Sequence, residues 1–187
     1  DESVSLHYAG GSESRDTANG FILWSGKEIM DQLQPLAAVG AGRLLRVGSR
    51  LGYAAGDWRA STYTATDILD EGGLEFEVMR PGRDLPRGVR ASYTAPARDW
   101  EPSEVPALAV PNGLGLLGDE GIKGIDLTQF CTSATQAMRV QKIEAARLGA
   151  QKSIRCMLPP DSVDLVAGAT MTMNLPSGWT RVNGTYE

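Results

Sequence analysis

Prolines and glycines are concentrated in the middle of the chain, and they limit the folds open to it. Residues 95–124 contain four prolines and five glycines. Proline lacks the backbone N–H that a helix requires, and its ring clashes with the preceding turn, so this density excludes a regular helix. We therefore expect an extended excursion or long loop at 95–124, lying over the surface of a domain.

A shorter stretch of the same kind, residues 80–88, has two prolines, two glycines and charges of both signs. This composition is typical of a connection between packed units. We predict a linker at 81–88, between one domain at 1–80 and a second at 89–187, since 187 residues can form two small domains. The chain starts without an initiator methionine, and we expect it to be a fragment of a longer protein.

The first predicted domain combines one helix with short strands. Ser25 stands three residues before Glu28, which is the spacing of a capping box. An apolar stripe then runs along residues 29–38 and predicts a helix, although Pro35 must kink or divide it. Residues 43–53 have the layout of a β-hairpin, with Gly48-Ser49 as its turn.

The second predicted domain alternates apolar and polar residues in short runs, around one long helix. Thr132 or Ser133 is placed to cap a helix that ends near Gly149. Period-2 alternation at 89–93, 153–158 and 170–175 predicts strands, as in a small barrel or sandwich. The predicted fold class is α+β and mostly β: a small α+β domain followed by a β-barrel-like domain that carries one helix.

Charge and hydropathy exclude two classes of protein. The chain has 18 Lys and Arg against 23 Asp and Glu, a formal charge of −5, whereas a protein that binds nucleic acid through bulk charge is basic. No stretch approaches the roughly 18 apolar residues of a membrane-spanning helix. We expect neither sequence-specific nucleic-acid binding nor a membrane segment.

The residues that usually carry catalysis or hold metals are scarce. His7 is the single histidine, and Cys131 and Cys156 have no further ligand beside them, so a zinc site is not expected. Residues 113–118 match GxGxxG, but they lack the preceding strand and following helix of a dinucleotide site. The acidic pairs at 119–120 and 161–164 are typical of solvated turns. We expect no catalytic residue, cofactor or metal.

One aromatic residue has the context of a contact surface. Trp100 lies between Asp99 and Glu101-Pro102 in the proline-rich segment, and exposed tryptophans are common anchors of protein interfaces. Local packing is the alternative. The candidate interface residues are Tyr93, Asp99 and Trp100.

Two blocks of motifs follow one another in a recognisable order. The first runs from Asn19-Gly20 through the helix at 29–38 into Gly42-Arg43-Leu44, with Gly48 and Tyr53 beyond it. The second contains Val89, Tyr93, Pro96 and Trp100 in this order, and then Gln136-Ala137-Met138-Arg139 at the start of a helix with Arg147 near its end.

Together these blocks resemble the central tail-hub, or tail-tip, protein of long-tailed bacteriophages, the family of host-specificity protein J. The likeness spans nearly the whole chain, and gene transfer agents carry a related hub. In one departure, Gly88 precedes Val89, where an asparagine is common in that family.

The resemblance implies a structural protein of the virion tail, with no enzymatic activity: a homotrimer that closes the distal end of the tail tube and organises host attachment. Its implied partners are further copies of itself, distal tail and tube proteins, the tape-measure protein and, through other regions, a host receptor. A tail-associated hydrolase and a carbohydrate-binding β module are the alternatives. A cleft with convergent carboxylates would favour the hydrolase, and an exposed aromatic strip would favour the sugar binder.

Overall fold

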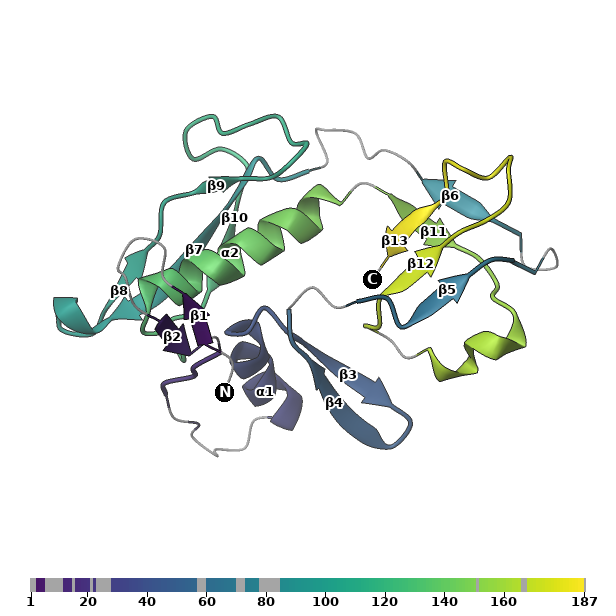
Figure 1. Ribbon diagram of the computed structural model, residues 1–187. Coiled ribbons are helices and arrows are strands. Elements are labelled where there is room, and N and C mark those ends of the chain that lie inside the picture. Colours follow the sequence, from purple (N-terminus) through teal and green to yellow (C-terminus); the bar gives the residue numbers. More distant parts are fainter. Residues whose placement is uncertain are drawn as a thin grey trace. The chain divides into compact units, whose positions relative to one another are not determined.

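The computed structural model describes residues 3–5, 12–14, 16–20, 22, 28–56, 60–69, 73–77, 85–150, 152–165 and 168–186. The chain packs as two compact units, each assembled from separate parts of the sequence (Figure 1). Unit 1 comprises Asp1–Leu44, Tyr53–Asp57 and Gly82–Gly149. Unit 2 comprises Leu45–Gly52, Trp58–Pro81 and Ala150–Glu187.

Unit 1 is built on a four-stranded sheet whose central strand is β7 (Gly88–Ala95). On one side β7 pairs in parallel with β10 (Ile122–Asp126). On the other it pairs antiparallel with β8 (Glu101–Glu104) and β9 (Leu108–Ala109). The helix α2 (Ala134–Gly149) packs along β7 and covers one face of the sheet (Figure 1).

The alternating burial of the β7 side chains shows which face of the sheet α2 covers. Val89, Ala91 and Ala95 are buried, whereas Arg90 and Ser92 on the opposite face are partly exposed. Because neighbouring side chains of a strand point to opposite faces, the odd-numbered residues face α2 and the even-numbered residues form a polar outer face.

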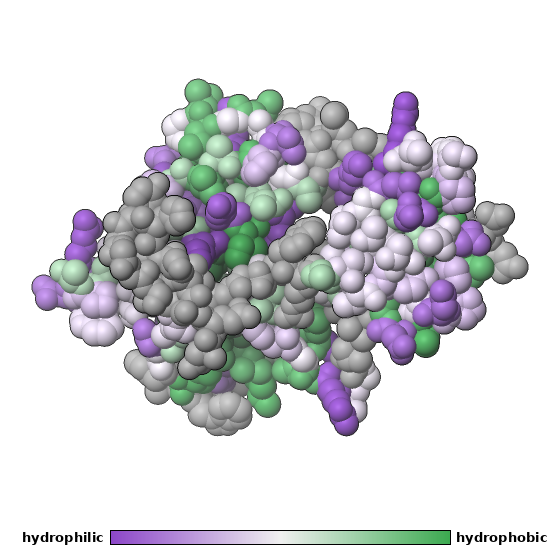
Figure 2. Space-filling view, in the orientation of Figure 1, coloured by the Kyte–Doolittle hydropathy of each residue, from purple (hydrophilic) through white to green (hydrophobic). Residues whose placement is uncertain are grey.

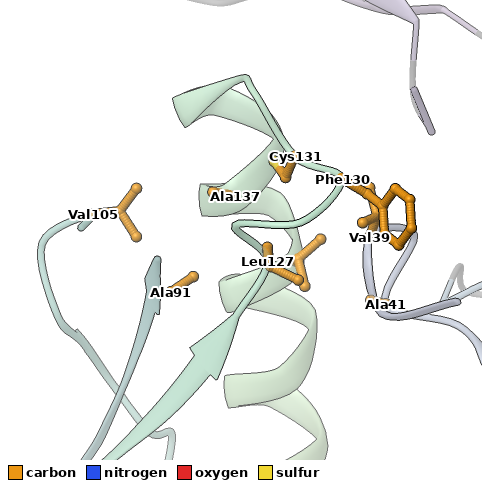
Figure 3. Packing of buried hydrophobic residues seen from close by; sticks show 9 residues of the cluster. Val39, Ala41, Ala91, Val105, Leu127, Phe130, Cys131 and Ala137 are labelled. Atoms are coloured by element: carbon orange, nitrogen blue, oxygen red, sulfur yellow. The ribbon is translucent and has the colours of Figure 1, made fainter. Parts of the chain in front are cut away.

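The core of unit 1 joins residues that are distant in the sequence. α1 (Ile29–Ala38) ends in a turn that delivers Val39 and Ala41 into the same cluster as Leu127, Phe130 and residues of β7 and α2 (Figure 3). The backbone carbonyl of Val39 accepts a hydrogen bond of 3.3 Å from the buried Gln136 side chain. The segment before the predicted linker therefore packs into one core with the segment after it.

The predicted helices are confirmed, with differences at their ends. Ser133 accepts a 3.4 Å hydrogen bond from the backbone N–H of Gln136 at the start of α2. α1 begins at Ile29, and Glu28 before it makes no side-chain capping bond; Ser25 lies outside the described residues. Ile29 is 54% exposed, so the predicted stripe is buried only farther along the helix.

Unit 2 contains two small sheets. β12 (Met171–Met173) lies between β5 (Tyr63–Ala65), to which it is parallel, and β13 (Gly184–Tyr186), to which it is antiparallel. β6 (Glu75–Glu77) pairs antiparallel with β11 (Ser153–Arg155). Ala65, Met173, Leu175 and Val182 form the buried cluster of this unit. A 3₁₀ helix, η4 (Pro160–Asp164), follows β11.

Two further pairs of strands complete the described elements. β1 (Ser3–Ser5) pairs with β2 (Ser12–Ser14). β3 (Arg43–Val47) and β4 (Arg50–Ala54) form the predicted hairpin, with Gly48 in the left-handed region at a φ of 61°. Neither of the helices α1 and α2 is long and apolar enough to cross a membrane.

The predicted class, α+β and mostly β, is confirmed, but the predicted barrel is wrong. The sheets of the described residues have two to four strands, and none closes on itself. The period-2 patterns contain real strands, and β11 and β12 each have a partner, β6 and β5, from a distant segment. Alternation does not reveal whether strands close a barrel or form separate small sheets.

The two units do not follow the predicted domains 1–80 and 89–187, because each draws on both sides of the predicted linker. Residues 81–84 of the predicted linker lie outside the described part of the chain. One segment of unit 2 ends at Pro81, and the next residue, Gly82, belongs to unit 1. The prediction of a loop at 95–124 is also wrong in part. The segment contains no α-helix, as expected, but β8, β9 and the start of β10 lie in it.

Candidate assembly interface

A tight turn ends the hairpin of β7 and β8, and it carries two of the predicted interface residues. The 3₁₀ helix η3 (Pro96–Arg98) leads into Asp99 and Trp100, which have positive φ angles of 53° and 63°. The backbone N–H of Trp100 donates a 3.1 Å hydrogen bond to the Ala95 carbonyl and closes the turn. Left-handed backbone at a bulky residue costs roughly 1–2 kcal/mol, and such strain is concentrated at functional sites.

This hairpin tip, residues 96–101, presents its tryptophan to solvent. Trp100 is 65% exposed, and the flanking Asp99 and Glu101 are exposed as well. A tryptophan offers a large apolar area at little entropic cost, which is why it is enriched among the anchors of protein interfaces. The tip therefore has the composition and the fixed geometry of a contact point.

The third predicted interface residue lies elsewhere. Tyr93 is in the middle of β7, opposite Ser103 of β8, and its half-buried side chain packs against the core cluster under α2. The structure brings Asp99 and Trp100 together and places Tyr93 on the inner face of the sheet.

The glycine-rich segment after β9 is a loop that an ion pair and a packing contact hold against β7. Arg90 of β7 forms ion pairs with Asp119 of this loop and with Glu104 of β8, and the pair with Asp119 is the main cause that raises the pKa of Arg90. Leu116 covers Gly88, where an added Cβ would lie 2.4 Å from its side chain. Leu114 and Leu117 are 60% and 57% exposed, and Figure 2 shows hydrophobic surface over this loop.

A groove of about 440 Å³ lies in unit 1 between α1, the start of β3 and β10. Its lining is mixed: Met30, Ala38 and Ile125 are apolar, whereas Arg43 and Lys123 are charged. Figure 2 shows hydrophobic surface over α1. Two cationic side chains, those of Arg43 and Lys123, line the groove. The one carboxylate in its lining, that of Glu144, forms a 2.7 Å ion pair with Arg147. Its lining includes Met30, Ala38, Arg43, Lys123, Gly124 and Ile125.

The groove was not predicted from the sequence. Its residues come from three segments that are brought together only by the shared core of α1, β10 and α2. One signal was available: Met30, which is 46% exposed, follows Ile29 at the start of α1 and lies off the apolar stripe of that helix.

Two carboxylates of the described residues accept hydrogen bonds from neighbouring groups. Asp126 accepts hydrogen bonds from the hydroxyl and the backbone N–H of Thr128, at 2.6 and 3.0 Å, and these lower its pKa. Asp161 accepts a 3.0 Å bond from the Tyr63 hydroxyl; burial first, and then Asp161, raise the pKa of Tyr63. In the described part of the chain, no three His, Cys, Asp or Glu residues gather as metal ligands, and His7 lies outside it.

Comparison with known families decides what kind of protein this is. A family model described as "Putative phage tail protein" matches residues 28–185, which include α1, the sheet of unit 1, α2 and the sheets of unit 2. The chain belongs to this phage tail protein family. It is accordingly a structural component of the virion tail.

The fold of this phage tail protein is similar to a chain in the solved structure of the virion of a native gene transfer agent particle. The TM-score is 0.60 and the sequence identity 22%, over 79% of this chain and 33% of the other. The tail protein therefore spans about a third of the chain that it matches. No curated protein matches its sequence.

Proposed function

We propose that this tail protein is a hub component, which closes the distal end of the tail tube and organises host attachment, and that three copies form the ring. Membership of the tail family supports a structural role, and the order of motifs from Asn19-Gly20 to Arg147 supports the hub of the host-specificity protein J family. The matched fold belongs to a gene transfer agent virion, so the proposal extends to the hub of such a particle.

In this role the protein contacts copies of itself, distal tail and tube proteins and the tape-measure protein, and it is joined to receptor-binding regions elsewhere in the assembly. Its formal charge of −5 agrees with a ring through which DNA passes without adhering, because like charges repel. No catalytic step belongs to this role.

A single observation carries the proposal: Trp100 is 65% exposed on a turn that holds it in the left-handed region. In an isolated domain, an exposed tryptophan with a strained backbone does not stabilise the fold. In a subunit of an assembly, the same side chain can bury its apolar surface against a neighbour and stabilise the contact. We infer that the hairpin tip contacts a neighbouring subunit in the assembled tail, with Asp99 beside it. Tyr93 supports the base of the same strand pair.

The test replaces Trp100 by Ala in particles that carry the full chain. Because an anchor tryptophan typically contributes about 2 kcal/mol or more, Trp100→Ala should weaken subunit association at least about thirtyfold and reduce the yield of complete tails. The matched control is Trp179→Ala, which removes a tryptophan that is 49% exposed in unit 2. Equal tail yields from the two variants would refute the contact.

A further inference from the structure

The sheet of unit 1 has two unlike edges. The Val105 backbone N–H donates a 3.0 Å hydrogen bond to the Ala91 carbonyl, so alternate residues of β8 face β7 and Pro102 faces outward. Because proline has no N–H, the outer edge of β8 lacks a donor at this position and is a poor site for adding a strand.

The other edge, along β10, pairs with no further strand of the described residues, and we call it the open edge. The Leu127 N–H donates to the Ser92 carbonyl at 2.9 Å, and the Ser92 hydroxyl donates to the Ile125 carbonyl at 3.3 Å. Odd-numbered residues of β10 thus turn their backbone groups toward β7, and Gly124 turns its carbonyl away from β7. Gly124 is exposed, and an added Cβ would meet no atom within 4 Å.

This open edge forms one wall of the 440 Å³ groove, a size within the usual range of about 300–1,000 Å³ for pockets that hold a small ligand. Met30 and Ala38 of α1 and Ile125 of β10 supply apolar surface. A buried indole needs such surface together with an acceptor for its N–H. The outward carbonyl of Gly124 is an acceptor of that kind.

The charges of the groove and of the hairpin tip are opposite. Arg43 and Lys123 line the groove, and no carboxylate of the described residues forms an ion pair with either. Around Trp100, the segment from Arg98 to Glu104 has one arginine against three carboxylates. Complementary charge of this kind selects the orientation in which two surfaces meet.

We propose that the hairpin tip of one copy docks in the groove between α1 and β10 of the next copy, with Trp100 as the anchor. The inference rests on the proposed function, in which Trp100 contacts a neighbour, and it adds the identity of the surface that receives it. The tip follows β7 at the β8 side of the sheet, and the groove adjoins the opposite edge. The contact is therefore head-to-tail, and repeated contacts of this type close a ring when the rotation allows it.

The first experiment places a photocrosslinker at the anchor. Copies carrying Trp100→p-benzoylphenylalanine are mixed with ¹⁵N-labelled copies before tail assembly, irradiated in the assembled tails and mapped by mass spectrometry. The expected product joins position 100 of the unlabelled copy to residues 30–44 or 123–125 of a labelled copy. A crosslink to another region of the second copy, or to a different tail protein, overturns this inference and leaves the proposed function standing. No intermolecular crosslink overturns both.

The second experiment exchanges the charges. Lys123→Glu and Glu101→Lys should each reduce incorporation of the chain into tails about fivefold, as expected for charge pairs in a contact. The double variant should recover to within about twofold of the unaltered chain, because it restores an opposite pair. Asp164→Lys, the same type of charge change in unit 2, is the control. Additive losses in the double variant overturn the proposed pairing of tip and groove.

Discussion

The guanidinium of Arg147 on α2 donates a 2.6 Å hydrogen bond to the backbone carbonyl of Ala41, across 106 positions of the sequence. Ala41 closes the turn after α1 with a positive φ of 49°, and its carbonyl lies at a helix end where acceptors lack intrahelical partners. This bond fastens α1 to α2, and so it fixes one wall of the groove beside β10.

Arg147→Ala should lower the free energy of unfolding by about 2 kcal/mol, because a charged donor is removed from a largely buried carbonyl and from Glu144. Urea denaturation followed by circular dichroism measures the loss. Lys142→Ala, an exposed position on the same helix, should change the free energy of unfolding by less than about 0.5 kcal/mol. Equal effects at the two positions would show that the bond is not part of the stable fold.

Leu127→Ala should be among the most damaging single changes. Leu127 is 2% exposed within the core of unit 1, and truncating a buried leucine to alanine typically costs about 2–5 kcal/mol. The same change at Leu114, which is 60% exposed, should be nearly neutral for stability. Denaturation midpoints that fall equally for both variants would contradict the burial described for Leu127.

Gly149→Ala tests how the glycine-rich loop packs on α2. Alanine is normally a better helix residue than glycine by about 1 kcal/mol, but here the added Cβ would lie 2.6 Å from the Pro111 carbonyl oxygen. We expect a net loss of about 1–2 kcal/mol, as for other overpacked sites. Gly124→Ala is the control, since its Cβ meets nothing within 4 Å. A more stable Gly149→Ala variant would contradict the packing of the loop against this helix end.

Asp126 gives a pH dependence with a defined sign. The Thr128 hydroxyl and backbone N–H lower the pKa of Asp126 in the folded chain. The ionised carboxylate therefore contributes to the free energy of unfolding above the pKa of the unfolded chain, about 3.9. This contribution is lost as the pH falls through the lower pKa of the folded chain. The carboxylate is largely exposed, and Asp126→Asn should cost only about 0.5 kcal/mol at pH 7. Thermal unfolding should show this difference shrinking below about pH 4. A difference that grows on acidification would have the wrong sign.

The sequence predicted the local elements of this protein better than their partners. A cap at Thr132 or Ser133, the hairpin turn at Gly48 and the strand at 89–93 all follow from short-range chemistry, and the structure contains them, with Ser133 as the capping residue. The pairings of β6 with β11 and of β5 with β12 join segments that are far apart in the chain. The alternation of apolar and polar residues specifies which side of a strand is buried, but it does not specify which other strand pairs with it.

Proline caused the clearest error in the predicted topology. Four prolines in 95–124 argue against a helix, and that part of the reasoning was correct. Pro102 nevertheless lies within β8, because a strand at the edge of a sheet admits proline where the missing N–H would point outward. The boundary after Pro81 falls inside the predicted linker, but the segments on its two sides are not separate domains. Burial of Val39 and Ala41 with Leu127 depends on contacts that no local composition reveals.

Part of the proposed interface could be selected from the sequence. Trp100 and Asp99 could be selected from their context, because an aromatic residue among prolines and acids has no local core to join. The groove that we propose as its receptor required the structure, since Arg43 and Lys123 are eighty positions apart in the chain.

The most direct test of the hub proposal is a cryo-electron microscopy structure of the assembled tail that carries this chain. The proposal predicts three copies in a ring at the distal end of the tube, with Trp100 buried against a neighbouring subunit. A tail in which the protein lies away from the distal end, or in which Trp100 stays as open to solvent as in the single chain, would contradict it.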